Sequence, residues 1–196
     1  MRLFVAIAPP EAALDEIAAA TSPLRDAWPQ LRWTDRRRWH ITLAFLGEVD
    51  EIVAGRLGPR LERAAGRHPA LALSVAGAGA FARPARARVL WAGIGGDQRA
   101  LAALAGSVAA GCRRAGAPPP DEGRRFRPHL TLASSRAPTD VRALVQSLSG
   151  FAGTPWQAGE ISLIRSILGA RPRYEAIGSW PLRAPSERSR YRRSMT

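Results

Sequence analysis

The sequence predicts an α+β protein with mixed sheets. Segments rich in β-branched and aromatic residues are interleaved with amphipathic segments of helical period. They do not follow the regular strand-helix-strand repeat that an all-parallel sheet requires. A chain of 196 residues suits one domain. We therefore expect one domain over residues 1–182, followed by an arginine-rich, disordered tail over residues 183–196, which carries no hydrophobic pattern.

The first half of the chain begins with a predicted strand and continues with two predicted helices. Residues 2–8 (RLFVAIA) have strand character and end at Pro9, whose fixed φ and missing N–H suit the start of a helix. The first helix is predicted from residues at helical spacing, namely Leu14, Ile17, Thr21 and Leu24. The second is predicted in the same way from Ile52, Val53, Leu57 and Leu61. Pro59 lies inside the second series, so we expect it to kink or shorten that helix.

The rest of the chain adds two helices, a long loop and four strands. A third helix is predicted from Leu101, Leu104, Val108 and Cys112. Residues 113–128 hold four prolines and no periodic pattern, which indicates a loop. Thr139 is expected to cap a fourth helix that ends at Gly150. The strands are predicted at residues 71–75, 88–94, 161–168 and 174–182.

Composition narrows the partners and the location of the protein. The net charge of +13 indicates an anionic partner, with nucleic acid the first candidate. All 29 basic residues are arginine, which also fits a general bias in composition, so charge alone is modest support. The opening MRLFVAI is too short for a signal peptide and no apolar run is long enough to span a membrane. We therefore expect a cytoplasmic protein that binds no membrane and acts as a monomer.

The most informative pattern is a pentapeptide that occurs twice. HITLA at residues 40–44 and HLTLA at residues 129–133 both follow the pattern H-[IL]-T-L-A. Side chains alternate between the two faces of a strand, so the histidine, threonine and alanine of each copy are expected on one face. By the same alternation, Trp39 and Phe45 are expected in the core, whereas Trp33 is left as an aromatic that could stack on a base.

Two such strands facing each other across a groove would form an acid–base site. Imidazole titrates near neutral pH, so one ring can accept a proton from water while the other donates one to a leaving oxygen. Hydroxyl groups beside them can donate hydrogen bonds to the non-bridging oxygens of a phosphate. This chemistry cleaves a phosphodiester without a metal. The residues concerned are His40, His129, Thr42 and Thr131.

A structural role is the alternative for any single histidine, and the duplication is what argues against it here. A zinc site is disfavoured because zinc takes three or four protein ligands. The third histidine, His68, lies in a loop-like segment without a carboxylate or thiolate at ligand spacing, and we expect it on the surface. The single cysteine, Cys112, excludes an internal disulfide and is expected to be a buried core thiol.

Five segments of the chain resemble the two-histidine phosphoesterases, and among them the RNA 2′,3′-cyclic phosphodiesterases, also described as 2′-5′ RNA ligases. The segments are MRLFVAI, WHITLAFLGEV, GAGAFARPARARVLWAGI, FRPHLTLAS and SLIRSILGARPRYEAIGSWPL. The resemblance implies a bilobal α+β fold with two mixed or antiparallel sheets, outer helices and approximate two-fold symmetry around a central cleft. It also implies no cofactor.

The resemblance further implies that the substrate is an RNA end with a 2′,3′-cyclic phosphate and that the product is a 2′-phosphate. It assigns catalysis to His40 and His129 and phosphate binding to Thr42 and Thr131. His40 would protonate the departing 3′ oxygen and His129 would activate water. Composition and spacing leave open which histidine is the acid and which is the base.

One position departs from the family pattern. Relatives often carry arginine directly after the second TLA, where this chain has Ser134. A contact with phosphate or ribose is then absent, or it is supplied by Arg136, or by Arg125 and Arg127. The last two lie in the predicted loop of residues 113–128 that leads into the second motif, which we call the approach loop. Ordinary solvated charge is the alternative interpretation of these arginines.

Other functions remain open at this stage. The same chemistry would serve a phosphodiesterase of small cyclic nucleotides. A non-catalytic module that binds RNA ends would use the histidines only as phosphate contacts. Joining of 2′-5′ RNA ends would be the reverse reaction at the same site.

Overall fold

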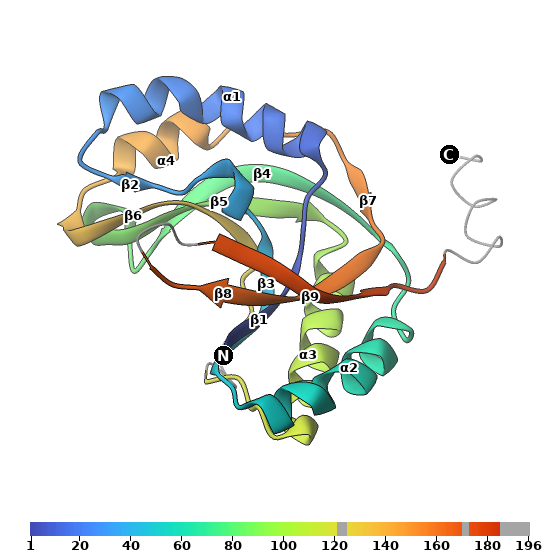
Figure 1. Cartoon of the computed structure of the whole chain (residues 1–196). Coiled ribbons are helices and arrows are strands. Elements are labelled where there is room, and N and C mark those ends of the chain that lie inside the picture. The colour runs from blue at the N-terminus through green and yellow to red at the C-terminus, as the bar shows by residue number, and fades with distance from the viewer. Residues whose placement is uncertain (121–124, 170–172, 185–196) are drawn as a thin grey trace, which may run out of the picture.

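A computed structural model describes residues 1–120, 125–169 and 173–184, and these form two antiparallel sheets with flanking helices (Figure 1). The helices are α1 (Glu11–Ala27), α2 (Glu51–Ala65), α3 (Gln98–Ala115) and α4 (Arg142–Leu148). The strands are β1 (Arg2–Ile7), β2 (Arg32–Trp33), β3 (Ile41–Glu48), β4 (Leu71–Phe81), β5 (Ala87–Gly96), β6 (His129–Thr139), β7 (Trp156–Ala158), β8 (Glu160–Ile167) and β9 (Arg173–Pro181). The predicted α+β class is confirmed.

Each sheet contains one copy of the repeated motif. The four-stranded sheet has the order β3-β1-β8-β9, and the five-stranded sheet has the order β2-β6-β5-β4-β7. All the strand pairs named here are antiparallel. The motif strand of one sheet, β3, pairs with β1, and the motif strand of the other, β6, pairs with β5. Each motif strand thus has an antiparallel neighbour, although β3 lies at the edge of its sheet and β6 lies between β2 and β5.

The helices cover the sheets in pairs. Figure 1 shows α1 and α4 together over the five-stranded sheet, where both contact β4. The other two helices, α2 and α3, pack against each other. In addition, α2 contacts β9 and α3 contacts β3, and both strands belong to the four-stranded sheet. The predicted apolar faces are the buried ones: Leu57 and Leu61 of α2 and Leu101 and Leu104 of α3 are fully buried. Each pair of helices thus covers one face of a sheet and leaves the other face of that sheet available for a site.

Several sequence expectations differ from the structure in detail. Thr139 does not cap a helix, because β6 continues to this residue and Asp140 accepts the hydrogen bond from the Arg142 amide instead. Pro59 does not shorten α2, which runs on to Ala65. Two short strands, β2 and β7, were not predicted. They are two and three residues long, which is too short to show an alternation of apolar and polar residues. The tail prediction lies mostly outside the described residues.

Candidate active site

The two motif histidines are held in the same way on the two sheets. Nδ1 of His40 lies 2.7 Å from the backbone oxygen of Arg38, and Nδ1 of His129 lies 2.7 Å from that of Arg127. A carbonyl oxygen only accepts hydrogen bonds, so Nδ1 carries the proton and donates in both rings. This leaves Nε2 of each ring as the nitrogen that can exchange a proton with a substrate.

Aromatic side chains enclose both imidazoles. The ring of His40 lies 4.6 Å from Phe4 and 5.3 Å from Tyr174, measured between centroids. The ring of His129 lies 5.0 Å from Phe81 and 6.2 Å from Trp91. These neighbours exclude water from one side of each ring and fix its plane. Both histidines are therefore positioned before any ligand binds.

The pKa values of both motif histidines are lowered. Burial is the largest cause in each case and lowers the pKa of His40 and of His129 below 6.5, against the opposing effect of the backbone hydrogen bond. The charge on His129 lowers the pKa of His40 further. Such an effect requires the two rings to lie within range of each other's field, and β3 and β6 indeed contact each other across the two sheets. Proton uptake by one ring thus opposes uptake by the other.

A β-bulge occurs at the same position of both motif copies. Ala6 pairs with Thr42 and Val5 with Ala44, which leaves Leu43 as the extra residue of β3. In the second copy, Trp91 pairs with Thr131 and Leu90 with Ala133, which leaves Leu132 as the extra residue of β6. The duplication therefore extends from the sequence to the strand register.

The bulge corrects one prediction from the alternation of side chains. An extra residue at Leu43 reverses the faces of the residues that follow it. Phe45 is consequently half-buried and lines a pocket of about 770 Å³, instead of packing in the core. Trp39, which precedes the bulge, is buried as expected. Trp33 donates to the Trp28 carbonyl oxygen and lines neither of the two pockets described next.

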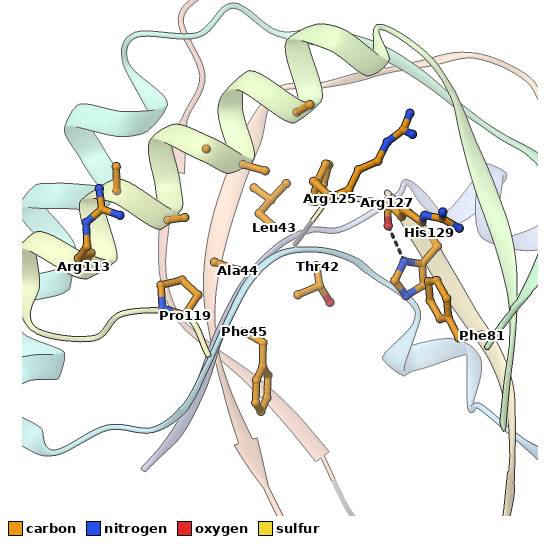
Figure 2. Close-up of a pocket in the computed structure, with 16 residues that line it drawn as sticks. Thr42, Leu43, Ala44, Phe45, Phe81, Arg113, Pro119, Arg125, Arg127 and His129 are labelled. Atoms are coloured by element: carbon orange, nitrogen blue, oxygen red, sulfur yellow. Dashed lines mark hydrogen bonds between the residues drawn. The ribbon is translucent and has the colours of Figure 1, made fainter. Parts of the chain in front are cut away.

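The larger pocket joins the two motifs. It has a volume of about 770 Å³, and Thr42 from the first motif and His129 from the second both line it. Figure 2 shows these two side chains facing one space beneath α3, with Arg125 and Arg127 at the same end. Arg125 and Arg127, whose side chains are exposed, bring two cations to the wall of the pocket that His129 lines. Polar groups predicted from both motifs thus meet in one cavity.

The smaller pocket, of about 360 Å³, contains the other histidine. His40 lines it together with Phe4 and Tyr174. Two hydroxyl groups, on Ser162 and Ser179, are also in its wall and lie 2.8 Å from each other. The two histidines, which come from opposite sheets, therefore line two different pockets that share no lining residue.

Two predicted residues are not in either of these pockets. Thr131 is half-buried on β6 and lines neither. Arg136 is exposed seven residues beyond His129 on the same strand, and its backbone oxygen accepts a hydrogen bond from Arg88. Ser134, at the position where relatives often have arginine, pairs with Val89 and Arg32 in the sheet.

Sequence reasoning missed other residues that line the two pockets. Arg37 and Arg38 line the smaller one, directly before the first motif. Their signal was the run RRR at residues 36–38, which the general arginine bias obscured. Tyr174 reaches His40 from β9, which is distant in sequence and gave no local signal. The wall of the larger pocket on α3 consists mainly of small residues: Ala102, Ala105, Gly106, Ala109 and Ala110.

Other candidate features lie apart from this site. Cys112 is buried, and burial raises the pKa of its thiol to about 12, as suits a core residue. His68 is half-buried, and its Nε2 lies 2.8 Å from the hydroxyl oxygen of Ser107. In the part of the chain that the structure describes, no group of three or more potential ligand residues is arranged to hold a metal ion. None of the described helices is long and apolar enough to cross a membrane.

Comparison with known proteins identifies the same family. The family model of the 2′-5′ RNA ligase superfamily matches residues 8–169. A protein of Aeropyrum pernix named RNA 2′,3′-cyclic phosphodiesterase is 36% identical over 135 residues, which is 69% of this chain and 74% of that protein. One of the same name from Geobacillus stearothermophilus is 31% identical over 182 residues, or 91% of this chain and 56% of its own length.

Solved structures of this fold agree with the comparison of sequences. The apo crystal structure of LigT from E. coli has a TM-score of 0.75 and 27% identity, with 93% of this chain and 97% of LigT covered. LigT complexed with 3′-AMP gives a TM-score of 0.72 at 27% identity over 92% of this chain and 96% of that one. The match of the family model and the paired histidine motifs together establish that the chain belongs to the 2′-5′ RNA ligase superfamily of two-histidine phosphoesterases.

Proposed function

We propose that this protein hydrolyses 2′,3′-cyclic phosphate ends of RNA to 2′-phosphomonoesters, with His40 and His129 as an acid–base pair and without a metal. The observation that carries the proposal is the matched pose of the two imidazoles, each with Nδ1 bound to a backbone oxygen and the pKa of one sensitive to the charge of the other. Relatives named RNA 2′,3′-cyclic phosphodiesterase support the choice of substrate.

The proposed reaction needs one protonated and one neutral ring. The neutral Nε2 removes a proton from water as the water oxygen attacks phosphorus, and the protonated Nε2 donates its proton to the 3′ oxygen as the bond from phosphorus to that oxygen breaks. Thr42 and Thr131 donate hydrogen bonds to the non-bridging oxygens, whose charge grows in the transition state. The rings have then exchanged roles, and proton exchange with solvent restores the starting state.

In this proposal, each of the two pockets binds a different part of the substrate. The smaller pocket holds the nucleoside that carries the cyclic phosphate, because the exposed ring of Tyr174 offers an aromatic face next to His40. Arg37 and Arg38 line the same pocket and supply positive charge. On the other side, Arg125 and Arg127 offset the charge of the phosphate near His129. One chain supplies both histidines, so we propose that the monomer is active.

Turnover in a chelator tests the proposal as a whole. We expect the protein to convert adenosine 2′,3′-cyclic phosphate to adenosine 2′-phosphate at the same rate with and without EDTA, because imidazoles alone transfer the protons. The measurement is product identification by chromatography against 2′- and 3′-phosphate standards. Loss of turnover in EDTA, with recovery on adding a divalent metal, would contradict the metal-free mechanism. A 3′-phosphate product would contradict the proposed site of bond breaking.

The lowered histidine pKa values predict an acid-shifted pH optimum. Burial lowers the pKa of both rings below 6.5, so above that pH both are neutral and the general acid is missing. We expect kcat/KM, which reports the free enzyme, to peak below pH 6.5 and to fall on either side. A bound phosphate anion favours the charged ring and raises its pKa, so kcat should peak at a higher pH than kcat/KM. A kcat/KM that keeps rising above pH 6.5 would contradict this account.

A substrate with a better leaving group identifies the acid. Sulfur in place of the 3′ oxygen leaves as a thiolate and needs little protonation. We expect this substrate to restore turnover in one of the two variants His40→Ala and His129→Ala, the one that lacks the acid. The family resemblance assigns the acid to His40. Restoration in both variants or in neither would contradict a division of roles between the rings.

Ligation belongs to the same proposal. A 5′-hydroxyl end of RNA in the position of the attacking water would give a 2′-5′ linkage, because the base that deprotonates water can also deprotonate this hydroxyl while the acid protonates the departing 3′ oxygen. We propose that hydrolysis dominates, since water is present in large excess over RNA ends.

A further inference from the structure

The segment directly before the first motif is a turn that carries the hydrogen-bond acceptor of His40. Residues Arg36–Arg38 form this 3₁₀ turn, and the Trp39 amide closes it by donating to the Arg36 backbone oxygen at 3.1 Å. The backbone oxygen of Arg38, at the end of the turn, is the group that holds Nδ1 of His40. A rotation of the turn would therefore move the acceptor away from the ring.

Arg36 ties this turn to the start of α1. Its Nη1 donates to the carboxylate of Glu11, and its Nη2 lies 2.6 Å from Oδ1 of Asp15 and 3.1 Å from the backbone oxygen of Glu11. The planar guanidinium thus bonds to two carboxylates and a backbone oxygen at once, which fixes its orientation. A single exposed ion pair contributes little, but a network of several charges is the exception. We call these contacts the Arg36 clamp.

The partner of the clamp is itself anchored next to His40. Glu11 is the first residue of α1 and follows closely after Ile7, the last residue of β1. Ile7 is buried and pairs with Ile41, the residue after His40. The strand β1 lies between β3 and β8 inside the four-stranded sheet. The clamp therefore holds the turn against the same strand that positions His40 from its other side.

The other two arginines of the turn have a different environment. Arg37 and Arg38 line the smaller pocket together with His40, and Arg36 does not line it. In the described parts of the chain, Arg36 is the one residue of the turn whose side chain bonds to another element. Loss of the clamp would therefore release the acceptor oxygen and both pocket arginines together.

We propose that Arg36 is a positioning residue for His40. The clamp holds the turn so that the Arg38 oxygen accepts from Nδ1, which leaves Nε2 of His40 to exchange a proton with the substrate. The effect of the clamp on the ring stands by itself, whereas its effect on turnover rests on the proposed function. His129 provides an internal comparison, because its acceptor, the Arg127 oxygen, lies outside this turn.

Two variants break the clamp from opposite ends. Arg36→Gln removes a positive charge, and the double variant Glu11→Gln/Asp15→Asn removes two negative charges and leaves Arg36 in place. If the clamp acts by position, both variants have the same effect, although they change the local charge in opposite directions. Arg142→Gln is the matched control, because Arg142 also bonds to a carboxylate, that of Asp140, and lines neither pocket.

The first measurement is the tautomer of each histidine ring, read from the nitrogen-15 shifts of the side chains at a pH above 6.5, where the motif rings are neutral. In the wild-type protein we expect the proton on Nδ1 of both His40 and His129. In both clamp variants His40 should lose this preference, because its acceptor is displaced, while His129 keeps it. Arg142→Gln should match the wild-type protein in both rings.

The second measurement is kcat for adenosine 2′,3′-cyclic phosphate. Both clamp variants should lower kcat by about tenfold, the lower end of what the loss of a group that orients a functional histidine costs. Adding Arg36→Gln to the double variant should cause no further loss, because the clamp is already broken. Arg142→Gln should keep wild-type kcat. Circular dichroism checks that each variant is folded.

The outcomes separate this inference from the proposed function. An unchanged His40 tautomer in the folded clamp variants would overturn the inference, whatever the effect on kcat. Opposite changes of kcat in Arg36→Gln and Glu11→Gln/Asp15→Asn would also overturn it, because the effect would then follow charge and not position. Absence of turnover in the wild-type protein would defeat the proposed function, and the tautomer comparison would still decide whether the clamp positions the ring.

Discussion

Replacing either motif histidine with alanine should lower turnover of a cyclic-phosphate nucleotide by about 10³-fold, because each variant lacks one of the two proton-transfer groups. We expect the fold to survive, since each ring contacts the protein through one backbone hydrogen bond and aromatic neighbours at the edge of a cavity. The measurement is kcat for His40→Ala and His129→Ala with adenosine 2′,3′-cyclic phosphate, together with circular dichroism of both variants.

The third histidine provides a matched control for this experiment. His68 is also half-buried and also bonded, to Ser107, but it lines neither of the two pockets. His68→Ala should therefore keep wild-type kcat. Folded His40→Ala or His129→Ala protein with near wild-type turnover would show that the corresponding ring does not take part in the reaction.

Removing the hydroxyl group of Thr42 should lower kcat by about 10²-fold. Valine keeps the shape of threonine but cannot donate the hydrogen bond that stabilises the non-bridging oxygen in the transition state. Thr42 lines the same pocket as His129, which places its hydroxyl beside the proposed position of phosphorus. We expect Thr42→Val to lower kcat with little change in KM, and Thr42→Ser to retain most of the activity.

Thr131 and Thr139, both on β6, extend this test. Thr131→Val should resemble Thr42→Val if the second motif repeats the role of the first. Thr139 lies ten residues beyond His129, and its hydroxyl bonds to Ser135, so Thr139→Val should leave kcat unchanged. Wild-type kcat in Thr42→Val would exclude a hydroxyl contact to the phosphate at this position.

The duplicated site could be predicted because it repeats a short, regular pattern. Two pentapeptides with the same alternation indicate two equivalent strands, and the structure extends this equivalence to the bulges at Leu43 and Leu132. The bulges themselves could not be predicted, because period-two reasoning assumes that each residue has one partner. Phe45 was assigned to the core for this reason, and it lines the larger pocket instead.

Residues that reach the site from a distance were also beyond sequence reasoning. Tyr174 contacts His40 from β9, at the opposite edge of its sheet from β3, through the curvature of the fold. Arg136 shows the opposite case: it is close to His129 in sequence and was predicted to contact the substrate, but it lines neither pocket. An extended strand advances about 3.3 Å per residue, so seven residues carry Arg136 about 23 Å away from His129. Arg37 and Arg38 had the local signal, but the overall arginine content concealed it.

The central claim is that His40 and His129 act together on a single phosphorus atom, and the double variant His40→Ala/His129→Ala tests it most directly. Two groups that serve one transition state are not additive, because removal of either already disables the shared step. The account predicts that the double variant hydrolyses adenosine 2′,3′-cyclic phosphate about as slowly as each single variant. A double variant whose loss equals the product of the two single losses would contradict the claim, because the two rings would then act independently.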